Sequence, residues 1–391
     1  MILAHKIALD PNSTQRTYFA KAAGTARFAY NWGLAEWQAQ YQAWKDNPLL
    51  AKPNEAALRR QLNSIKREHF PWMLEVTKCA PQQAIMQLGD AFKNFFAGHA
   101  KYPRFHKKGI NDSFALDNGQ FNLNGSRIRL PHLGWVRIRE TLRFTGKILS
   151  ATISRTADRW FVAIVMDTDQ TLTRPAENQG VVGVDLGVTT LATLSTGEPV
   201  PGPKAHQAAL KRIERKVKFS RNWRKAKAKL ARLHARIANV RQDATHKLTS
   251  DLARRFHTIG IEDLNVSGMV QNRHLARAVA DMGFFEFRRQ LDYKTAMRGG
   301  SVVVADRWFP SSKTCSRCDQ HHPEMILGVD TLRCDCGAVI SRDLNAAINL
   351  AKYAASSAVS ACGGEGAGAR RKTRVKPAPV KQEVNFVHVC S

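Results

Sequence analysis

Acidic residues and long apolar segments are both scarce in this sequence of 391 residues. It has 32 Asp and Glu against 60 Lys and Arg, which leaves a net charge of +28 and a pI near 10.2. An imbalance of this size disfavours an ordinary metabolic enzyme and points to a polyanionic partner. No segment approaches the roughly 20 apolar residues of a membrane-spanning helix, and the apolar run before Asp10 is too short for a secretory signal. We therefore expect a cytoplasmic protein with no membrane partner.

Cysteine is also scarce, and its distribution favours metal ligation over a disulfide framework. Seven cysteines are an odd number, and four of them lie within 22 residues. Cys315 with Cys318, and Cys334 with Cys336, offer four thiolates, the ligand set of one closed structural Zn²⁺ site. His321 or His322 replaces a thiolate if the shorter second pair cannot close, and free or redox-active cysteines are the remaining alternative. The other three, Cys79, Cys362 and Cys390, are expected to be ordinary residues.

The composition otherwise predicts a folded α+β multidomain chain. Hydrophobic residues make up 43% and charged residues 24%, and this length suggests two to four domains. Residues 11–109 carry apolar side chains at helical spacing, and we expect their aromatic stripe to be core rather than a base-stacking surface. Residues 110–172 alternate with period two, which favours a small β-barrel or sandwich with Arg facing outward. We expect the strand at 1–10 to join that sheet, so that the helical domain is an insertion.

The second half has the element order of the ribonuclease-H-like nuclease fold. Three strands, a long helical region, a strand, a helix, a strand and a last helix are expected between residues 178 and 355. The predicted strands are 181–187, 189–194, 198–200, 258–262 and 301–305, and the predicted helices are 204–256 as a basic hairpin, 284–297 and 344–355. The nuclease domain then comprises 178–306 and 339–355, with a zinc ribbon inserted at 307–338 and a disordered tail at 356–391.

Three acids occupy positions where this fold would bring them together. Asp185 lies in an apolar strand, where a carboxylate is costly unless a cation compensates its charge. Glu262 ends the fourth strand and Asp343 begins the last helix. Converging carboxylates would repel one another without cations, so we expect them to bind two Mg²⁺ (or Mn²⁺) ions and to be catalytic. Asp263 is the alternative to Glu262, although we expect it to face the opposite side of the strand. Asn345 or Asn349 could assist the acids, with capping or packing as the alternative.

Basic side chains concentrate in two segments. Between residues 204 and 255 there are 17 Lys and Arg against three acids, which predicts strongly salt-dependent binding to phosphates. A basic face for an acidic protein is the alternative. The segment 101–109 interleaves basic and aromatic residues, as either a nucleic-acid contact or a solvated linker. The candidate contacts are Lys101, Tyr102, Arg104, Phe105, Lys107, Lys211, Arg215, Arg221, Arg224 and Lys225.

With these residues placed, the chain resembles the transposon-encoded TnpB (OrfB) family, relatives of the type V CRISPR effector nucleases. The resemblance covers nearly all of residues 1–355. It rests on Gly183-Val-Asp-Leu-Gly187, Ile261-Glu-Asp-Leu264, Ser312-Lys-Thr-Cys-Ser-Arg-Cys318, Ser341-Arg-Asp-Leu-Asn345, Asn31-Trp-Gly33 and Tyr102-Pro-Arg-Phe105. The short pair Cys334 and Cys336, and Ser341 where Asp is common, depart from the family pattern.

The resemblance implies an RNA-guided DNA endonuclease of a prokaryote, located at the nucleoid and expected to be a monomer. The matching acids, Asp185, Glu262 and Asp343, would form a RuvC-type site beside the zinc module. A guide RNA from the transposon end would pair with double-stranded target DNA, while a wedge-like barrel and a helical recognition domain hold RNA and read a short transposon-adjacent motif. Two alternatives are an RNA-guided regulator that binds DNA without cutting, and a transposase or resolvase that needs no RNA.

Overall fold

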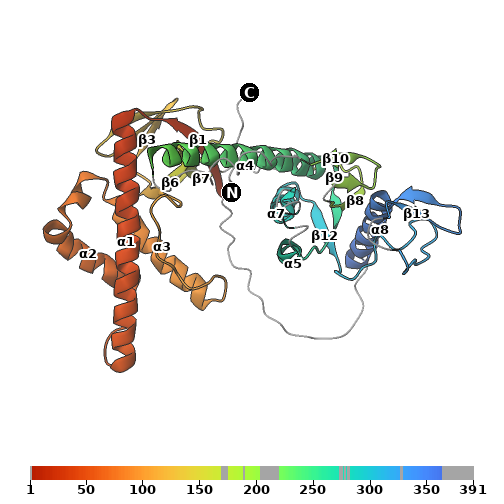
Figure 1. Ribbon diagram of the computed structural model, residues 1–391, viewed down its shortest axis with the longest axis horizontal. Coiled ribbons are helices and arrows are strands. Elements are labelled where there is room, and N and C mark those ends of the chain that lie inside the picture. Colours follow the sequence, from red (N-terminus) through yellow and green to blue (C-terminus); the bar gives the residue numbers. More distant parts are fainter. Residues whose placement is uncertain are drawn as a thin grey trace. The chain divides into compact units, whose positions relative to one another are not determined.

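The computed structural model describes residues 2–168, 175–187, 190–202, 220–272, 276, 279, 282–325 and 329–362. These residues divide into two compact units, one ending at residue 168 and the other beginning at residue 175 (Figure 1). Each unit has its own hydrophobic core. No helix in the described ranges is long and apolar enough to cross a membrane.

The first unit packs three helices against one antiparallel sheet. Its strand order is β2-β6-β7-β1-β5-β4-β3. The strands are β1 (Ile2–Asp10), β2 (Ser113–Asp117), β3 (Asn122–Asn124), β4 (Arg127–Leu130), β5 (Gly134–Ile138), β6 (Lys147–Thr156) and β7 (Arg159–Asp167). As predicted, β1 joins this sheet, pairing with β7 and β5. The order ends at β2 and β3, and no pair of described strands closes it into a barrel.

Alternation along β4 and β5 places arginines outside and apolar residues inside, as the period-two pattern predicted. Ile128, Leu130, Val136 and Ile138 are buried, whereas Arg127, Arg129 and Arg137 are exposed.

The helices of the first unit are α1 (Ser13–Asp46), α2 (Glu55–His69) and α3 (Cys79–Phe96), with a short 3-10 turn, η1 (Pro71–Glu75), before α3. Asn12 starts α1 with a capping box. The Asn12 side chain accepts a hydrogen bond from the Gln15 backbone N–H, and the Gln15 side chain accepts one from the Asn12 backbone N–H. Phe19, Tyr30 and Phe92 are buried, and Trp37 and Phe95 pack against the same core. Most of the aromatic stripe is therefore core, as predicted.

The second unit is built on a five-stranded sheet of order β10-β9-β8-β11-β12. Its strands are β8 (Val181–Asp185), β9 (Thr190–Leu194), β10 (Pro199–Pro201), β11 (Thr258–Glu262) and β12 (Ser301–Ala305). β8, β9 and β10 are antiparallel neighbours, whereas β11 runs parallel to both β8 and β12. The first and fourth strands of this sheet are therefore adjacent, as the sequence predicted.

The helices of the second unit are α4 (Arg221–Arg255), α5 (Val266–Gln271), α7 (Phe284–Met297) and α8 (Arg342–Cys362), and a small hairpin joins β13 (Thr331–Arg333) to β14 (Val339–Ser341). Two predictions need correction. Residues 221–255 form one continuous helix, and the other arm of the predicted hairpin, from 204 to 219, lies outside the described residues. The last helix continues to Cys362 rather than ending at 355, so residues 356–362 are helical and do not belong to the predicted disordered tail.

Candidate active site and zinc centre

The register of the central sheet places two of the predicted acids side by side. Val184 on β8 pairs with Ile261 on β11, and the two strands are parallel. The next residue on each strand is an acid, Asp185 and Glu262. Since side chains at paired positions of parallel strands point to the same face, these carboxylates share one face at the carboxyl ends of β8 and β11.

The third acid, Asp343, lies on α8, whose backbone crosses this face very close to the backbones of β8 and β11. A Cβ at Gly183 would lie 1.8 Å from the Ala347 carbonyl oxygen, and one at Gly260 would lie 2.4 Å from that of Leu350. Only glycine permits this approach of helix backbone to strand backbone. Asp343 lies in the first turn of α8, where the positive end of the helix dipole favours a carboxylate.

The charges of Glu262 and Asp343 both act on Asp185. Burial, followed by the charges of Glu262 and Asp343, raises the pKa of Asp185 to about 8, and the nearby Arg342 opposes this rise. Arg342 therefore belongs to the site, although the sequence analysis did not single it out. Asp343 itself is exposed to solvent, so the group opens on one side.

Glu262 and its neighbour Asp263 have different environments. Asp263 forms ion pairs with Arg288 at 2.9 Å and Arg307 at 2.8 Å, and Arg288 is the main cause of its lowered pKa. Glu262 accepts a hydrogen bond from the hydroxyl of Ser311 and contributes to the raised pKa of Asp185. Asp263 therefore faces arginines, whereas the charge of Glu262 acts on Asp185.

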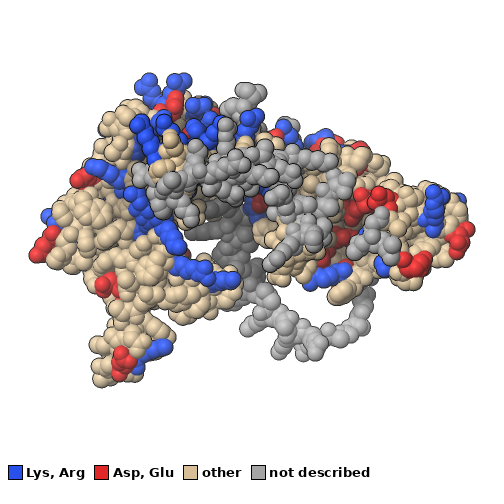
Figure 2. Space-filling view, in the orientation of Figure 1, with Lys and Arg blue, Asp and Glu red and all other residues tan. Residues whose placement is uncertain are grey.

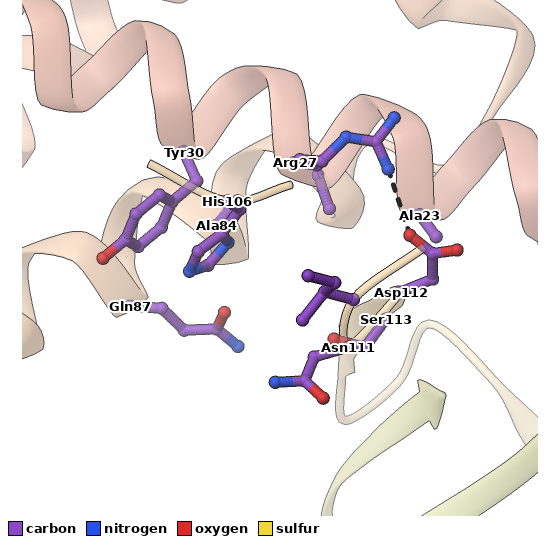
Figure 3. Close-up of a pocket in the computed structure, with 11 residues that line it drawn as sticks. Ala23, Arg27, Tyr30, Ala84, Gln87, His106, Asn111, Asp112 and Ser113 are labelled. Carbon is purple, nitrogen blue, oxygen red and sulfur yellow. Dashed lines mark hydrogen bonds and ion pairs between the residues drawn. The ribbon is translucent and has the colours of Figure 1, made fainter. Parts of the chain in front are cut away.

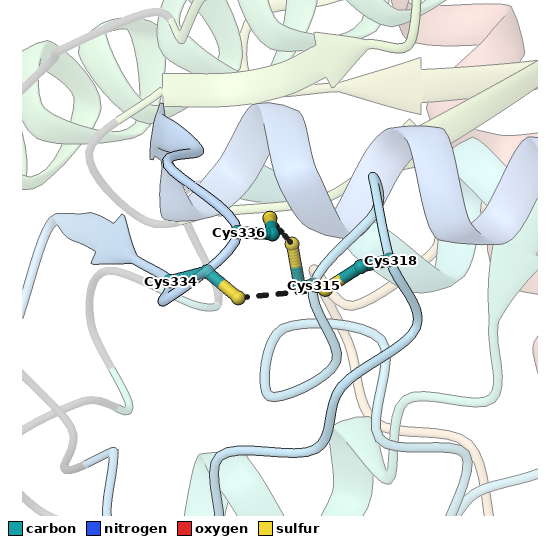
Figure 4. A group of neighbouring side chains, drawn as sticks. All are labelled: Cys315, Cys318, Cys334 and Cys336. Carbon is teal, nitrogen blue, oxygen red and sulfur yellow. Dashed lines mark hydrogen bonds between the residues drawn. The ribbon is translucent and has the colours of Figure 1, made fainter.

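The four predicted cysteines converge on one point (Figure 4). Their sulfur atoms all lie within 4.8 Å of one another, with 3.7 Å between Cys315 and Cys336 and 3.5 Å between Cys318 and Cys334. Sulfurs bound tetrahedrally to Zn²⁺ at about 2.3 Å are about 3.8 Å apart, so the group fits this ion. Backbone N–H groups of Arg317 and Cys318 lower the pKa of Cys315 to about 6 despite its burial.

The short second cysteine pair closes because Gly337 adopts a left-handed φ of 81° and donates to the Cys334 carbonyl at 2.9 Å. Neither histidine is needed as a replacement ligand. His321 forms a β-bridge with Thr314, and His322 lies 3.4 Å from Glu324. Among the described residues, the four cysteines are the one group of three or more His, Cys, Asp or Glu side chains that lie close enough to hold a single ion. Asp185, Glu262 and Asp343 do not form such a group.

Asn345 and Asn349 hold the zinc knuckle against α8. Both are buried, and each side-chain amide donates to the Thr314 carbonyl at 2.7 Å. The Asn345 side chain also accepts from the Ser316 backbone N–H at 2.7 Å. Packing, which the sequence analysis kept as the alternative to assisting the acids, therefore accounts for both residues. Ser341 accepts from the Leu344 N–H at 3.1 Å and caps α8 as an Asp would.

The loop from Lys101 to Lys107 is anchored on one side and exposed on the other. The His106 ring stacks on Tyr30 at 3.8 Å beside a small pocket that Gln87 and Asp112 also line (Figure 3). Tyr102 packs edge-on against Phe92 and Phe95. The remaining candidate side chains of this loop, Lys101, Arg104, Phe105 and Lys107, are exposed.

The basic candidates of the second unit are described in part. Arg221 and Lys225 are exposed on α4, whereas the backbone of Arg224 is described without its side chain, and Lys211 and Arg215 lie outside the described residues. No acid occurs on α4 before Asp243, which pairs with Lys247 at 2.7 Å. The first half of this helix is therefore uniformly basic. In Figure 2, basic side chains also form patches over the first unit.

Family models match three parts of the chain. A model described as "Probable transposase", of the OrfB_IS605 family, matches residues 162–273, and a "Cas12f1-like, TNB domain" matches 284–350. The latter range contains all four cysteines. A "Helix-turn-helix domain" model matches residues 1–46, where the structure has β1 followed by the single helix α1.

Two curated relatives are similar over nearly their whole length. A protein of Streptomyces pristinaespiralis named "Putative RNA-guided DNA endonuclease" is 37% identical over 97% of this chain and 96% of its own. InsQ of Escherichia coli K12, given the same description, is 35% identical over 92% and 94%. The fold is also similar to a solved structure titled as a Cas12f1-sgRNA-target DNA complex, with a TM-score of 0.51, 12% identity and coverage of 86% and 83%.

Proposed function

The chain belongs to the TnpB (OrfB) family of transposon-encoded proteins, and from this premise we propose that it is an RNA-guided DNA endonuclease with a RuvC-type active site. The observation that carries the proposal is the electrostatic group formed by Asp185, Glu262 and Asp343. Carboxylates are hard oxygen ligands, which Mg²⁺ and Mn²⁺ prefer. A cation among them would remove the repulsion that raises the pKa of Asp185.

The chemistry that we propose is hydrolysis of a DNA phosphodiester. When bound, two Mg²⁺ ions would activate a water molecule and stabilise the leaving 3′ oxygen. The chain itself supplies Asp185 and Glu262 from adjacent strands and Asp343 from the helix across them. The Zn²⁺ at the four cysteines is structural, since a four-sulfur site leaves no open position.

The partners that we propose are a guide RNA from the transposon end and double-stranded target DNA beside a short transposon-adjacent motif. The basic first half of α4 and the exposed side chains of the Lys101–Lys107 loop support them, because phosphates are bound by clustered Lys and Arg. The first unit would act as wedge and helical recognition domain, and the second as the nuclease domain with its zinc ribbon. The wedge domain would comprise residues 1–10 with 110–172, and the helical recognition domain residues 11–109.

The neighbouring acids Glu262 and Asp263 provide a sharp test. With the protein purified together with its RNA, Glu262→Gln should abolish Mg²⁺-dependent cutting of a matched target, a loss of at least about 100-fold. Asp263→Asn removes an equal charge one residue away and should leave cutting within a few-fold of wild type. Cutting by Glu262→Gln would contradict the site assignment.

The same preparation separates the alternative functions. If the RNA-loaded protein binds matched DNA but does not cut it with Mg²⁺ or Mn²⁺, the protein is an RNA-guided regulator. If cutting persists after complete ribonuclease digestion, it acts without a guide, as a transposase or resolvase would.

A further inference from the structure

We infer that Ser311 is a positioning residue for Glu262, and that it sets the affinity of the acidic group for divalent cations. This inference rests on the proposed function and concerns a residue that neither the motifs nor the comparisons single out. Ser311 is 3% exposed, and its hydroxyl donates to Oε1 of Glu262. A hydroxyl has a single proton. Once that proton is directed at Oε1, it fixes the rotation of the carboxylate and leaves Oε2 available to a cation.

Hydrogen bonds hold the backbone of Ser311 in place, and they therefore fix the direction in which its hydroxyl points. The Asn349 amide donates to the Ser311 carbonyl at 2.7 Å, with a longer contact of 3.4 Å from Asn345. The Ser311 N–H donates to the Phe309 carbonyl at 2.8 Å. Asn345 and Asn349 are 0% and 3% exposed, so water does not compete for these hydrogen bonds.

The same two asparagines connect the acids to the zinc knuckle. They project from α8, whose first turn carries Asp343. They also hold the Thr314 carbonyl, next to Cys315. One rigid group therefore contains Asp343, the loop that leads into the knuckle, and the hydroxyl that contacts Glu262. The position of Glu262 relative to Asp343 depends on this loop as well as on the sheet.

A residue that orients a metal ligand by a hydrogen bond typically changes metal affinity by about 10–100-fold when it is removed. We expect this range for Ser311→Ala. If Ser311 were only a satisfied buried hydroxyl, its removal would lower the stability of the fold without a selective change in cation affinity. Cation affinity and thermal stability therefore distinguish a positioning role from a packing role.

The test is a Mn²⁺ titration of the full-length, RNA-loaded protein, with free Mn²⁺ measured by electron paramagnetic resonance. Zinc content and the thermal midpoint are measured on the same samples. Ser311→Ala should weaken Mn²⁺ binding about 10–100-fold while retaining one zinc ion. The adjacent Ser312→Ala is the matched control and should bind Mn²⁺ as the wild type does.

A second pair of variants keeps the inference testable if Ser311→Ala folds poorly. Ser311→Thr keeps the hydroxyl and should retain most of the affinity, whereas Ser311→Val has the same shape without it and should lose the affinity. Wild-type affinity in the Ala or Val variant would overturn the inference. Failure of the proposed function gives a different result. In that case the wild type and Glu262→Ala would bind the same amount of Mn²⁺.

Discussion

Asp185 lies where a carboxylate is costly, and this cost is informative about its role. It ends a strand whose preceding residues, Val182 and Val184, are fully buried, and its pKa is raised to about 8 by burial, Glu262 and Asp343. Selection for stability alone would favour a neutral residue at this position. Functional sites commonly retain such destabilising groups.

Replacing Asp185 by Asn should therefore stabilise the cation-free protein while abolishing cleavage. Because the folded pKa lies above the unfolded value near 3.8, the wild type loses stability as pH rises from about 4 to 8, by at most about 1.4 kcal/mol per pH unit. The gain from Asp185→Asn should grow over the same interval. Calorimetry without added Mg²⁺ or Mn²⁺, on samples that retain their zinc, at pH 5 and pH 8, measures it as about 2–4 °C per kcal/mol. A variant that melts below the wild type at pH 8 would contradict this explanation.

At the scale of elements, the two halves of α4 differ in charge, because its acids, Asp243 and Asp251, both lie in the second half. Toward its C-terminus, Arg254 and Arg255 form ion pairs with Asp251, Glu177 and Glu198. In the first half, exposed cations such as Lys225 and Lys229 have no such acid on the helix. Cations that are already neutralised contribute less to counterion release than exposed ones do.

This difference predicts the salt dependence of RNA binding. Lys225→Gln should reduce the slope of log affinity against log salt concentration by about 0.7 to 0.9, the contribution of one phosphate contact. Lys247→Gln is the matched control, because its ammonium lies 2.7 Å from Asp243, and it should change the slope much less. Equal slopes for the two variants would show that this part of α4 does not contact nucleic acid.

The elements also show what can be predicted from the sequence. Gly183, Gly260 and the alternation along β8 and β11 are local patterns, so the strands and the order of the sheet could be predicted. The approach of α8 to Gly183 depends on packing between distant segments, which explains why the roles of Ser311, Asn345 and Asn349 were not assigned. The length of α8 was underestimated because Ala- and Ser-rich sequence after residue 355 is typical of a tail as well as of a helix.

At the scale of the whole molecule, the excess of 28 positive charges and the carboxylate group have opposite electrostatic requirements. The basic surface attracts nucleic acid, whereas the acids would repel a phosphate that approached them directly. Divalent cations bound at the acids would resolve this conflict, because they would neutralise the carboxylates and supply ligand positions for phosphate oxygens. The proposed hydrolysis therefore requires cations to bind at Asp185, Glu262 and Asp343 rather than elsewhere on the protein.

Anomalous scattering from crystals of the RNA- and DNA-bound protein grown with Mn²⁺ tests this requirement most directly. The account predicts two manganese peaks about 3.5 to 4 Å apart, ligated by carboxylate oxygens of Asp185, Glu262 and Asp343. Absence of manganese at these carboxylates in a complex that holds an intact target strand, or its binding only at other residues, would contradict the account.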